Sequence, residues 1–422
     1  MKAFREQARE LDQNDPIRHL RESFFIPKTP SGDDRIYLCG NSLGLQPKRT
    51  AEFIQQELED WKNLGVDGHF EARKPWMPYH EFLTKQMAEI VGGLPHEVVV
   101  MNSLTVNLHL LMVSFYRPDS DRFKIIIEKN AFPSDQYAVK SQLEYHGIDP
   151  KDGLLELPPS PGNAYTQEND LLQFIEQHGD ETALILLGGV NYYSGQAFPL
   201  HKIVKAGHKK GCVVGFDLAH AAGNIDCQLH ESGADFAAWC TYKYLNSGPG
   251  GMSGVFVHDR HAQNFDLPRF AGWWGHDKRS RFKMPDTFQP EPGAEGWQLS
   301  NPPILAMAAL RASLSIFGEV GIQSLRNKSK QLTSFFEKCI QSIPSDRIEI
   351  ITPKAEENRG CQLSLRVKGG DKTLFEALTH MGVVSDWREP DVIRIAPVPL
   401  YNTFEEGTLF AEKLEKALLA DN

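Results

Sequence analysis

An aspartate and a lysine, each placed directly after an apolar run, have the types and the setting for covalent chemistry. Asp217 closes the run 212–216, and Lys243 follows the run 236–240 and precedes a glycine-rich turn at 248–251. A lysine amine forms a Schiff base with an aldehyde, and a carboxylate keeps a ring nitrogen protonated, so that the ring withdraws electrons from a carbanion. Alone, Asp217 would fit a turn cap and Lys243 a solvated side chain. Together they predict the catalytic pair of a pyridoxal-phosphate enzyme.

The other parts of such a site have candidates at strand-to-helix junctions. A phosphate binds free backbone N–H groups in the first turn of a helix, and Leu104 and Thr105 begin a helical pattern after the apolar run 98–101. A threonine there also fits a simple helix cap. Phe132, at a second junction, is a candidate to stack on the cofactor ring or to join the core. His220 is a candidate cofactor contact or a structural histidine.

Composition and charge indicate a large globular enzyme and disfavour other classes. The chain has 422 residues, 41% of them hydrophobic, and its net charge of −10 disfavours a nucleic-acid partner. Its longest apolar runs are strand-sized and its N-terminus lacks the apolar run of a signal peptide, so we expect no membrane segment and a cytoplasmic location. The six cysteines show no Cys-x-x-Cys spacing and no His/Cys/Asp cluster has metal-ligand spacing, so we expect buried thiols and no metal.

Alternating strand and helix patterns must position these residues. Separate helical patterns divide the strand-like runs at 98–101, 123–128, 182–187, 212–216 and 235–240. This alternation predicts an α/β fold with a mostly parallel, doubly wound sheet. Ligands of such sheets bind at the carboxyl ends of the strands, which is where the aspartate and the lysine would lie.

A smaller α/β domain is predicted after this sheet. Beyond Pro302-Pro303 a helical tract runs to about residue 343, and strand patterns follow at 347–351, 361–367 and 392–395, with a last helix after Thr403.

Near the N-terminus, Asp15-Pro16 and Gln46-Pro47 have the cap-and-proline pattern that opens helices, and 35–38 is a short strand. We therefore expect an N-terminal segment that packs with the small domain (1–64), a large cofactor-binding domain (65–302) and a C-terminal small domain (303–422).

Over nearly its whole length the chain resembles the kynureninase family, which has the fold type I of pyridoxal-phosphate enzymes, in the aspartate aminotransferase superfamily. The segments that carry the resemblance are Tyr37–Gly44, Phe132–Asp135, Gly189–Gln196, Phe216–Ala221, Tyr242–Asn246, Gly272–His276, Ser300–Pro303 and Arg394–Pro399. The aspartate and the lysine alone fit many pyridoxal enzymes. The segments Gly272–His276 and Ser300–Pro303, in this order, are much more specific to this family.

The resemblance implies a role for each matching residue. Lys243 would form the Schiff base, Asp217 would hold the ring nitrogen, and Tyr242 would help to complete the cofactor and phosphate pocket. Its position next to Lys243 also makes Tyr242 a candidate proton donor in the later steps. The remaining cofactor-binding residues would be Leu104, Thr105, Phe132, Pro133, Ser134, Asp135, His220, Trp273 and Asn301. Substrate would be bound through its α-carboxylate by Arg394 and around its aromatic ring by His69, Trp274 and Asn301. Trp274 departs from relatives, in which this position is often another aromatic residue.

The activity implied by the resemblance is hydrolytic cleavage of the Cβ–Cγ bond of L-kynurenine or 3-hydroxy-L-kynurenine. The products would be anthranilate or 3-hydroxyanthranilate and L-alanine, in tryptophan degradation or NAD synthesis. His69 and Asn301 can both hydrogen-bond a 3-hydroxyl group, which favours its accommodation. The family resemblance also implies a homodimer in which some site residues come from the other subunit.

Three alternatives share the aspartate and the lysine. A cysteine desulfurase needs a reactive cysteine on a mobile loop, whereas Cys361 begins an alternating strand pattern that suits packing. An aminotransferase would require a keto-acid acceptor, and release of alanine without one separates the two. A binding or regulatory protein that kept the fold would have no need of Lys243.

Overall fold

The computed structural model describes residues 1–370 and 372–420, and a seven-stranded sheet lies at its centre. The strand order is β2-β8-β7-β6-β5-β3-β4, and β8 alone of these seven runs in the direction opposite to the other six. The strands span Val98–Val100 (β2), Lys124–Glu128 (β3), Leu154–Leu157 (β4), Thr182–Gly188 (β5), Val213–Asp217 (β6), Phe236–Cys240 (β7) and Ser253–Val257 (β8). The predicted α/β fold with a mostly parallel sheet is confirmed.

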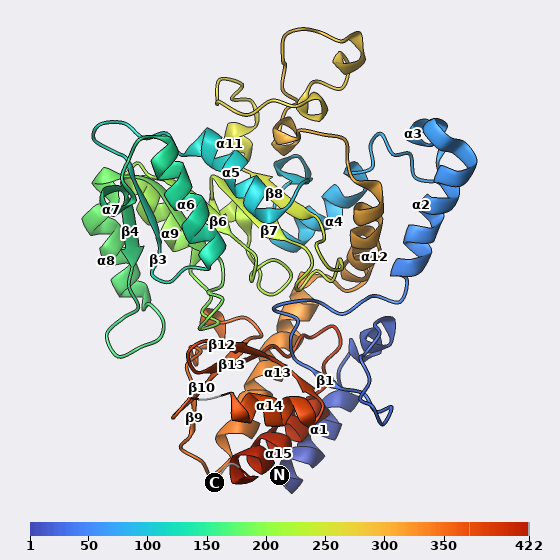
Figure 1. Ribbon diagram of the computed structural model, residues 1–422, viewed down its shortest axis with the longest axis vertical. Helices are drawn as coiled ribbons and strands as arrows, with labels where there is room; N and C mark the ends of the chain where they lie inside the picture. The colour runs from blue at the N-terminus through green and yellow to red at the C-terminus, as the bar shows by residue number, and fades with distance from the viewer. Residues whose placement is uncertain (371, 421–422) are drawn as a thin grey trace.

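Helices cover both faces of this sheet because its strands are apolar on both sides. In β3, for example, Ile126 packs on one face, whereas Ile125 and Ile127 pack on the other. The first face is covered by α4 (Glu81–Val91), α8 (Glu168–His178), α9 (Leu200–Lys209) and α12 (Ile304–Val320), and the second by α5 (Leu104–Phe115) and α6 (Pro133–Tyr145). Short helices are α3 (Gly68–Glu71), α7 (Pro150–Gly153), α10 (Leu229–Ser232) and α11 (Asp259–Ala262). We call this sheet and its helices the large unit, in the upper half of Figure 1.

The small unit, below it in Figure 1, is built on a four-stranded antiparallel sheet. Its order is β12 (Asp386–Arg388), β13 (Val392–Ile395), β10 (Leu363–Val367) and β9 (Ile348–Ile350). The helices that pack with it are α13 (Ile322–Gln341), α14 (Thr373–His380), α15 (Phe404–Ala420) and, from the N-terminus, α1 (Lys2–Gln13). A short parallel ladder joins β1 (Ile36–Tyr37) to β11 (Val383–Val384).

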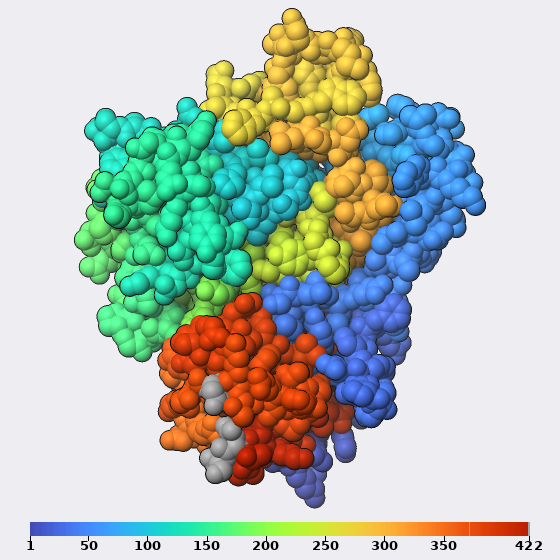
Figure 2. Space-filling model, viewed as in Figure 1, coloured from blue at the N-terminus to red at the C-terminus, as the bar shows by residue number. Residues whose placement is uncertain are grey.

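The N-terminal residues contact both units. Helix α1 packs with α15 of the small unit, whereas α2 (Thr50–Leu64) packs against α12 of the large unit. In Figure 2 the N-terminal residues (blue) extend from the small unit upwards along the large one. The predicted boundaries at residues 64 and 302 stay predictions. Helix α12 packs with the large unit, since its residues Met307, Leu310 and Leu314 lie in the core of that unit, and α2 packs there through its contact with α12.

Two predicted helices differ in detail from the structure. The helix expected after Asp15-Pro16 is wrong, because Asp15 accepts a hydrogen bond from the N–H of Ile17 (3.0 Å) and only a 3₁₀ helix follows, at Arg18–Ser23. The helical tract after Pro303 breaks at Gly321 (φ +73°), a conformation that glycine adopts without strain. Helices α12 and α13 therefore meet at an angle of 81°. Among the described residues no single helix is long and apolar enough to cross a membrane, although this bent pair passes the same test together.

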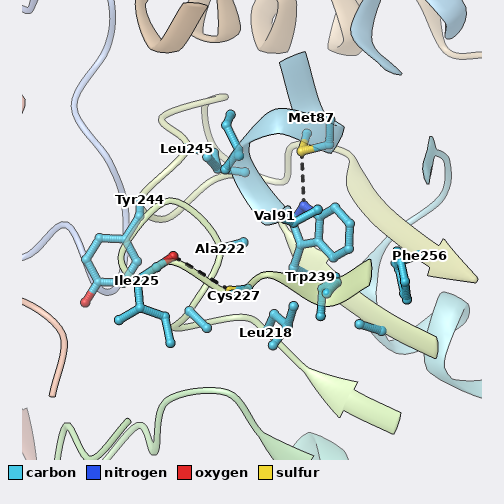
Figure 3. Close-up of a cluster of buried hydrophobic side chains, with 14 of the residues drawn as sticks. Met87, Val91, Leu218, Ala222, Ile225, Cys227, Trp239, Tyr244, Leu245 and Phe256 are labelled. Carbon is cyan, nitrogen blue, oxygen red and sulfur yellow. Dashed lines mark hydrogen bonds between the residues drawn. The ribbon is translucent and has the colours of Figure 1, made fainter. Parts of the chain in front are cut away.

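Buried side chains behind Lys243 fix the turn that carries it. Tyr244 and Leu245, the next two residues, are buried and pack in the core cluster with Leu218 and Ala222 from the segment after β6 (Figure 3). In the same cluster the indole N–H of Trp239, on β7, points at the sulfur of Met87 on α4, 3.2 Å away. Because these neighbours are close-packed, the backbone at Lys243 has little freedom to move.

A glycine of the N-terminal segment closes on this turn from the other side. The N–H of Gly44 donates to the carbonyl of Tyr242 (2.8 Å), and a Cβ atom at Gly44 would overlap the carbonyl oxygen of Lys243 and the side chain of Asn246. The close approach of the two backbones therefore requires glycine at this position.

We expect Gly44→Ala to lower the free energy of unfolding by about 1–3 kcal/mol, because the added methyl must displace backbone atoms. Gly318→Ala is the matched control: Gly318 lies on helix α12, and an added Cβ would meet Gln86 atoms at ordinary contact distances of 3.6 and 3.7 Å. That control should be neutral or more stable by about 0.5–1 kcal/mol. Urea unfolding of both variants checks the pair, and equal effects would contradict the proposed backbone contact.

Candidate active site

A cavity of about 280 Å³ lies where the carboxyl ends of the central strands face the small unit. Asp217 ends β6, Glu128 ends β3 and Gly188 ends β5, and all three line the cavity. Ten of the predicted site residues line it: Leu104, Thr105, Phe132, Ser134, Asp135, Asp217, His220, Tyr242, Lys243 and Arg394. Parallel strands bring these residues together from distant parts of the sequence because their carboxyl ends share one edge.

Lys243 and His220 are in direct contact in this cavity. The lysine Nζ lies 3.0 Å from His220 Nε2. Burial, together with the positive charge of Lys243, lowers the pKa of His220 well below its usual range, so the imidazole is neutral. With Nε2 facing the amine, the buried Nδ1 has no hydrogen-bond partner among the described residues. His220 is therefore able to orient the amine while leaving one ring nitrogen for a bound molecule.

Three carboxyl groups line the same cavity as the lysine. Asp217 Oδ1 accepts a hydrogen bond from the N–H of Ala219 (2.7 Å), and Glu128 Oε1 accepts one from the N–H of Gly188 (3.0 Å). Burial raises the pKa of Asp217. Burial, followed by the charge of Asp217, raises the pKa of Asp135 well above its usual range. Burial also raises the pKa of Glu128 to about 7. Ionised carboxylates in such a setting call for a cationic or hydrogen-bonding partner.

A protonated pyridine ring fits what this group of residues lacks. Asp135 and Asp217 share a hydrogen bond with each other, and the Nδ1 atom of His220 has no partner among the described residues. A ring N–H⁺ would give Asp217 a charged donor, and the nearby Lys243 amine is placed to react with an aldehyde. The residues present therefore fit pyridoxal phosphate.

The opposite wall provides hydroxyl groups and helix N-termini for a phosphate. Helix α5 begins at Leu104 and α6 begins at Pro133, both after strands of the sheet. Thr105 Oγ1, in the first turn of α5, lies 2.8 Å from Ser134 Oγ in the first turn of α6. Free N–H groups and hydroxyls at two helix N-termini suit an anion. Pro133 contributes no N–H and does not line the cavity, so its part is to start the helix.

Phe132 is the aromatic wall of the cavity. Its side chain is 43% exposed, and its ring centroid lies 6.0 Å from Lys243 Nζ and 5.4 Å from the ring of Tyr192, which meets it edge-on. An exposed ring that faces the reactive lysine is suited to stacking on a planar cofactor.

A cationic group from the small unit closes the cavity. Arg394, 1% exposed, donates through Nε to Asp386 Oδ1 (2.7 Å) and through Nη1 to the carbonyl of Tyr192 (2.6 Å), while its Nη2 also bonds Asp386. Ser42, from the N-terminal segment, donates to the same carboxylate (2.6 Å). Arg388 lines the cavity beside this group and pairs with Asp386 at 3.2 Å.

Besides Pro133, four predicted residues lie outside this cavity. His69 bonds the carbonyl of Val66 through Nδ1 (2.9 Å), and Asn301 is exposed. Trp274 is buried under the guanidinium of Arg281, which lies 4.5 Å from its ring, whereas Trp273 is 41% exposed. All of them belong to residues 65–72 or to the protruding segment 263–303 (yellow to orange in Figure 1).

Several cavity residues carried no predicted role: Asn41, Ser42, Glu128, Gly188, Val190, Tyr192, Ala219 and Arg388. Glu128 had a detectable signal, since it is a charged residue that ends an apolar strand. Asn41, Ser42 and Tyr192 lie in two of the segments that carry the family resemblance.

The predicted absence of a metal site stays a prediction. Among the described residues, Glu97, His230 and His258 are close enough together to bind a metal ion. The buried Glu97 is already satisfied, however, by the N–H groups of Leu94 (2.8 Å) and Asp259 (2.7 Å) and by His230 Nδ1 (2.9 Å).

Solved structures share this fold over nearly its full length. A cysteine desulfurase from Thermococcus onnurineus matches with a TM-score of 0.75 and 17% identity, covering 94% of this chain and 99% of that one. A mutant C-DES with glycine covalently linked to its pyridoxal-phosphate cofactor matches with a TM-score of 0.76 and 17% identity, covering 93% and 98%. The fold and the site together define a pyridoxal-phosphate-dependent enzyme of fold type I.

Close relatives narrow this class to one family. Kynureninases of Koribacter versatilis and Myxococcus xanthus are 56% and 55% identical to this chain, covering 96% and 97% of it and 95% and 96% of the relatives. Residues 325–414 match the family model of the kynureninase C-terminal domain. The chain belongs to the kynureninase family.

The raised pKa of Glu128 makes stability depend on pH. Between the ordinary carboxyl pKa of 4.5 and the folded value of about 7, the unfolded chain releases this proton and the folded chain keeps it. The contribution of Glu128 to the free energy of unfolding is therefore complete below pH 4.5 and is lost as pH rises through about 7.

We expect Glu128→Gln to gain stability relative to the parent protein as pH rises from 5 to 8, by up to about 3 kcal/mol, with the gain levelling off above pH 7. Urea unfolding of the cofactor-free proteins at pH 5, 6, 7 and 8 checks this. Glu156→Gln, an exposed glutamate on the neighbouring strand β4, is the control and should show no such trend. If the difference in unfolding free energy between Glu128→Gln and the parent protein did not change with pH, the carboxyl of Glu128 would not be the group that titrates.

Proposed function

We propose that this protein hydrolyses the Cβ–Cγ bond of L-kynurenine or its 3-hydroxy derivative, releasing L-alanine and anthranilate or 3-hydroxyanthranilate. The observation that carries the proposal is one cavity in which Lys243 and Asp217 face a guanidinium group of Arg394. An amino-acid substrate needs both ends of this arrangement, because its amine reacts at the cofactor and its carboxylate requires a cation. Membership of the kynureninase family supports the choice of substrate.

Bound pyridoxal phosphate supplies an electron sink for the substrate carbanion. Asp217 would hold the ring nitrogen in its charged form, and the first turns of α5 and α6 would hold the phosphate through Leu104, Thr105 and Ser134. Phe132 would stack on the ring, and Asp135 and His220 would complete the pocket. These assignments fit the places that the residues have in the cavity.

Lys243 moves the substrate α-proton. Its amine lies beside the neutral His220, which orients it by accepting a hydrogen bond at Nε2 (3.0 Å). An imidazole that stays neutral does not compete with the amine for a proton, so the amine is free to take a proton and to return it.

Tyr242 donates a proton in the later steps. Burial raises the pKa of its phenol above the ordinary value of 10, so the hydroxyl keeps its proton at neutral pH. The ring borders the cavity next to Lys243, whose Nζ lies 6.0 Å from the ring centroid. Its position beside Lys243 supports this assignment.

A homodimer supplies the rest of the site. The segment 263–303 and residues 58–70 expose several large apolar side chains, namely Leu58, Trp61, Val66, Phe70, Phe265, Phe270, Phe282 and Met284. Exposed apolar groups gathered on a few segments are typical of an interface. The same segments carry His69, Trp273, Trp274 and Asn301, which do not line the cavity of their own chain. Each chain would therefore lend these four residues to the site of its partner.

In the shared site His69, Trp274 and Asn301 would surround the aromatic ring of the substrate, and Trp273 would face the cofactor. His69 and Asn301 can bond a 3-hydroxyl group, so the 3-hydroxy substrate is accommodated as well. The cytoplasmic location and the absence of a nucleic-acid partner stay predictions.

The activity is tested by measuring alanine and the matching anthranilate released from L-kynurenine and from 3-hydroxy-L-kynurenine by the cofactor-loaded protein. We expect equal amounts of the two products without a keto-acid acceptor, and no turnover for Lys243→Ala, which lacks the reacting amine. Tyr242→Phe should keep its cofactor but lose about 10²–10⁴-fold in kcat. Absence of cleavage by the parent protein would reject the proposed reaction, and full activity of Tyr242→Phe would reject the role of Tyr242.

The shared site is tested by mixing two inactive variants, Lys243→Ala and the double variant Trp273→Ala/Asn301→Ala. A mixed dimer would hold one site with both defects and one intact site, so random exchange should restore about one quarter of the parent activity. If all these residues served the site of their own chain, each site of a mixed dimer would carry one defect and no activity would return. Each variant incubated alone, so that its dimers contain two identical chains, is the control.

A further inference from the structure

Three charged side chains of the small unit lie on one face of its sheet. β12 pairs with β13 in antiparallel register, with Asp386 opposite Arg394 and Arg388 opposite Val392. Residues two apart on a strand share a face, and directly paired residues share it as well. Asp386, Arg388 and Arg394 therefore project together, and both arginines reach the cavity.

Arg394 is already occupied by contacts within the protein. All three of its nitrogens donate hydrogen bonds, Nε and Nη2 to Asp386 and Nη1 to the carbonyl of Tyr192. Its side chain is 1% exposed. Each Nη keeps one free N–H, so Arg394 can offer a substrate only part of its fork.

Arg388 is the less occupied of the two guanidinium groups. Its one hydrogen bond to a described residue runs from Nη2 to Asp386 Oδ2, at 3.2 Å, and its buried Nε has no partner. Its side chain is 35% exposed, which leaves it room to adjust to a ligand. A buried donor without a partner is costly, and a carboxylate would satisfy it.

The charges of this face also fit one more anion. Two guanidinium groups share the single carboxylate of Asp386, because Arg388 and Arg394 both pair with it. One positive charge is left uncompensated on the face that borders the cavity. A substrate with one α-carboxylate supplies the missing negative charge.

We propose that Arg388 binds the substrate α-carboxylate together with Arg394, and that Asp386 holds the two guanidinium groups in register for it. Arg394 acts as the fixed side of this clamp and Arg388 as its adjustable side. This inference rests on the proposed function, since it takes an amino acid as the substrate.

The test uses Arg388→Gln and Arg388→Lys in the cofactor-loaded protein. We expect Arg388→Gln to raise KM for L-kynurenine about 10–100-fold with kcat changed far less, because a charged hydrogen bond to the substrate is lost. Arg388→Lys should recover part of the affinity, since it keeps the charge without the planar fork. Inhibition by kynuramine, the decarboxylated amine of the substrate, should be unchanged in both variants.

Arg366→Gln is the matched control. Arg366 lies on β10 of the same sheet, is 33% exposed and pairs with Glu349 (3.2 Å), but it does not line the cavity. Its kinetics should equal those of the parent protein.

Two results would overturn the proposal. One is an unchanged KM in Arg388→Gln while the parent protein is active. The other is an equal loss of affinity for L-kynurenine and kynuramine, which would mean that Arg388 merely supports the structure. If the parent protein cleaves neither substrate, the proposed function fails separately, and binding of L-alanine, followed by the cofactor absorbance, then tests Arg388 alone: weaker binding by Arg388→Gln supports the carboxylate contact, and equal binding rejects it.

Discussion

The contact between Lys243 and His220 inside a buried group of carboxyls is the interaction on which this molecule depends. An amine that must react with an aldehyde needs a fixed position and a neighbour that does not compete for its proton. The neutral imidazole, 3.0 Å from Nζ, meets both needs. Burial of Asp217, Asp135 and Glu128 around the amine costs free energy in the absence of a cationic ligand. The protein therefore holds a site that a positively charged ring stabilises.

The two units divide the chemistry between them. The large sheet places Glu128, Asp217 and the turn of Lys243 at or after the ends of β3, β6 and β7, whose residues near these ends are buried. The small sheet supplies two guanidinium groups to the cavity, those of Arg388 and Arg394, through the register of β12 against β13. Ser42 ties the N-terminal segment to Asp386, and Gly44 of the same segment lies against the Lys243 turn. One short segment thus contacts both the turn of Lys243 and the charged group on β12 and β13.

Much of this arrangement could be predicted from the sequence, because its signals are local. Apolar runs located the central strands, and residues that follow such runs, such as Asp217 and Lys243, indicated the site. β4 and β8 were missed, and the direction of β8, antiparallel in a mostly parallel sheet, depends on pairing with distant strands. The role of Arg388 had no local signal at all, because it follows from strand register and from how many hydrogen bonds Arg394 has already made. The partner's contribution to the site was anticipated from family resemblance alone and stays a proposal.

The proposed roles of Lys243 and of the guanidinium groups on β12 and β13 would direct two bonds of a substrate α-carbon, one through its amine and one through its carboxylate. The aromatic ring of an aryl-ketone side chain would then need an apolar surface to cover it. The exposed aromatic residues of 58–70 and 263–303, on a second copy of the chain, have the chemistry for that cover. In the proposed dimer, recognition of the aromatic ring and assembly of the two chains would be the same physical event.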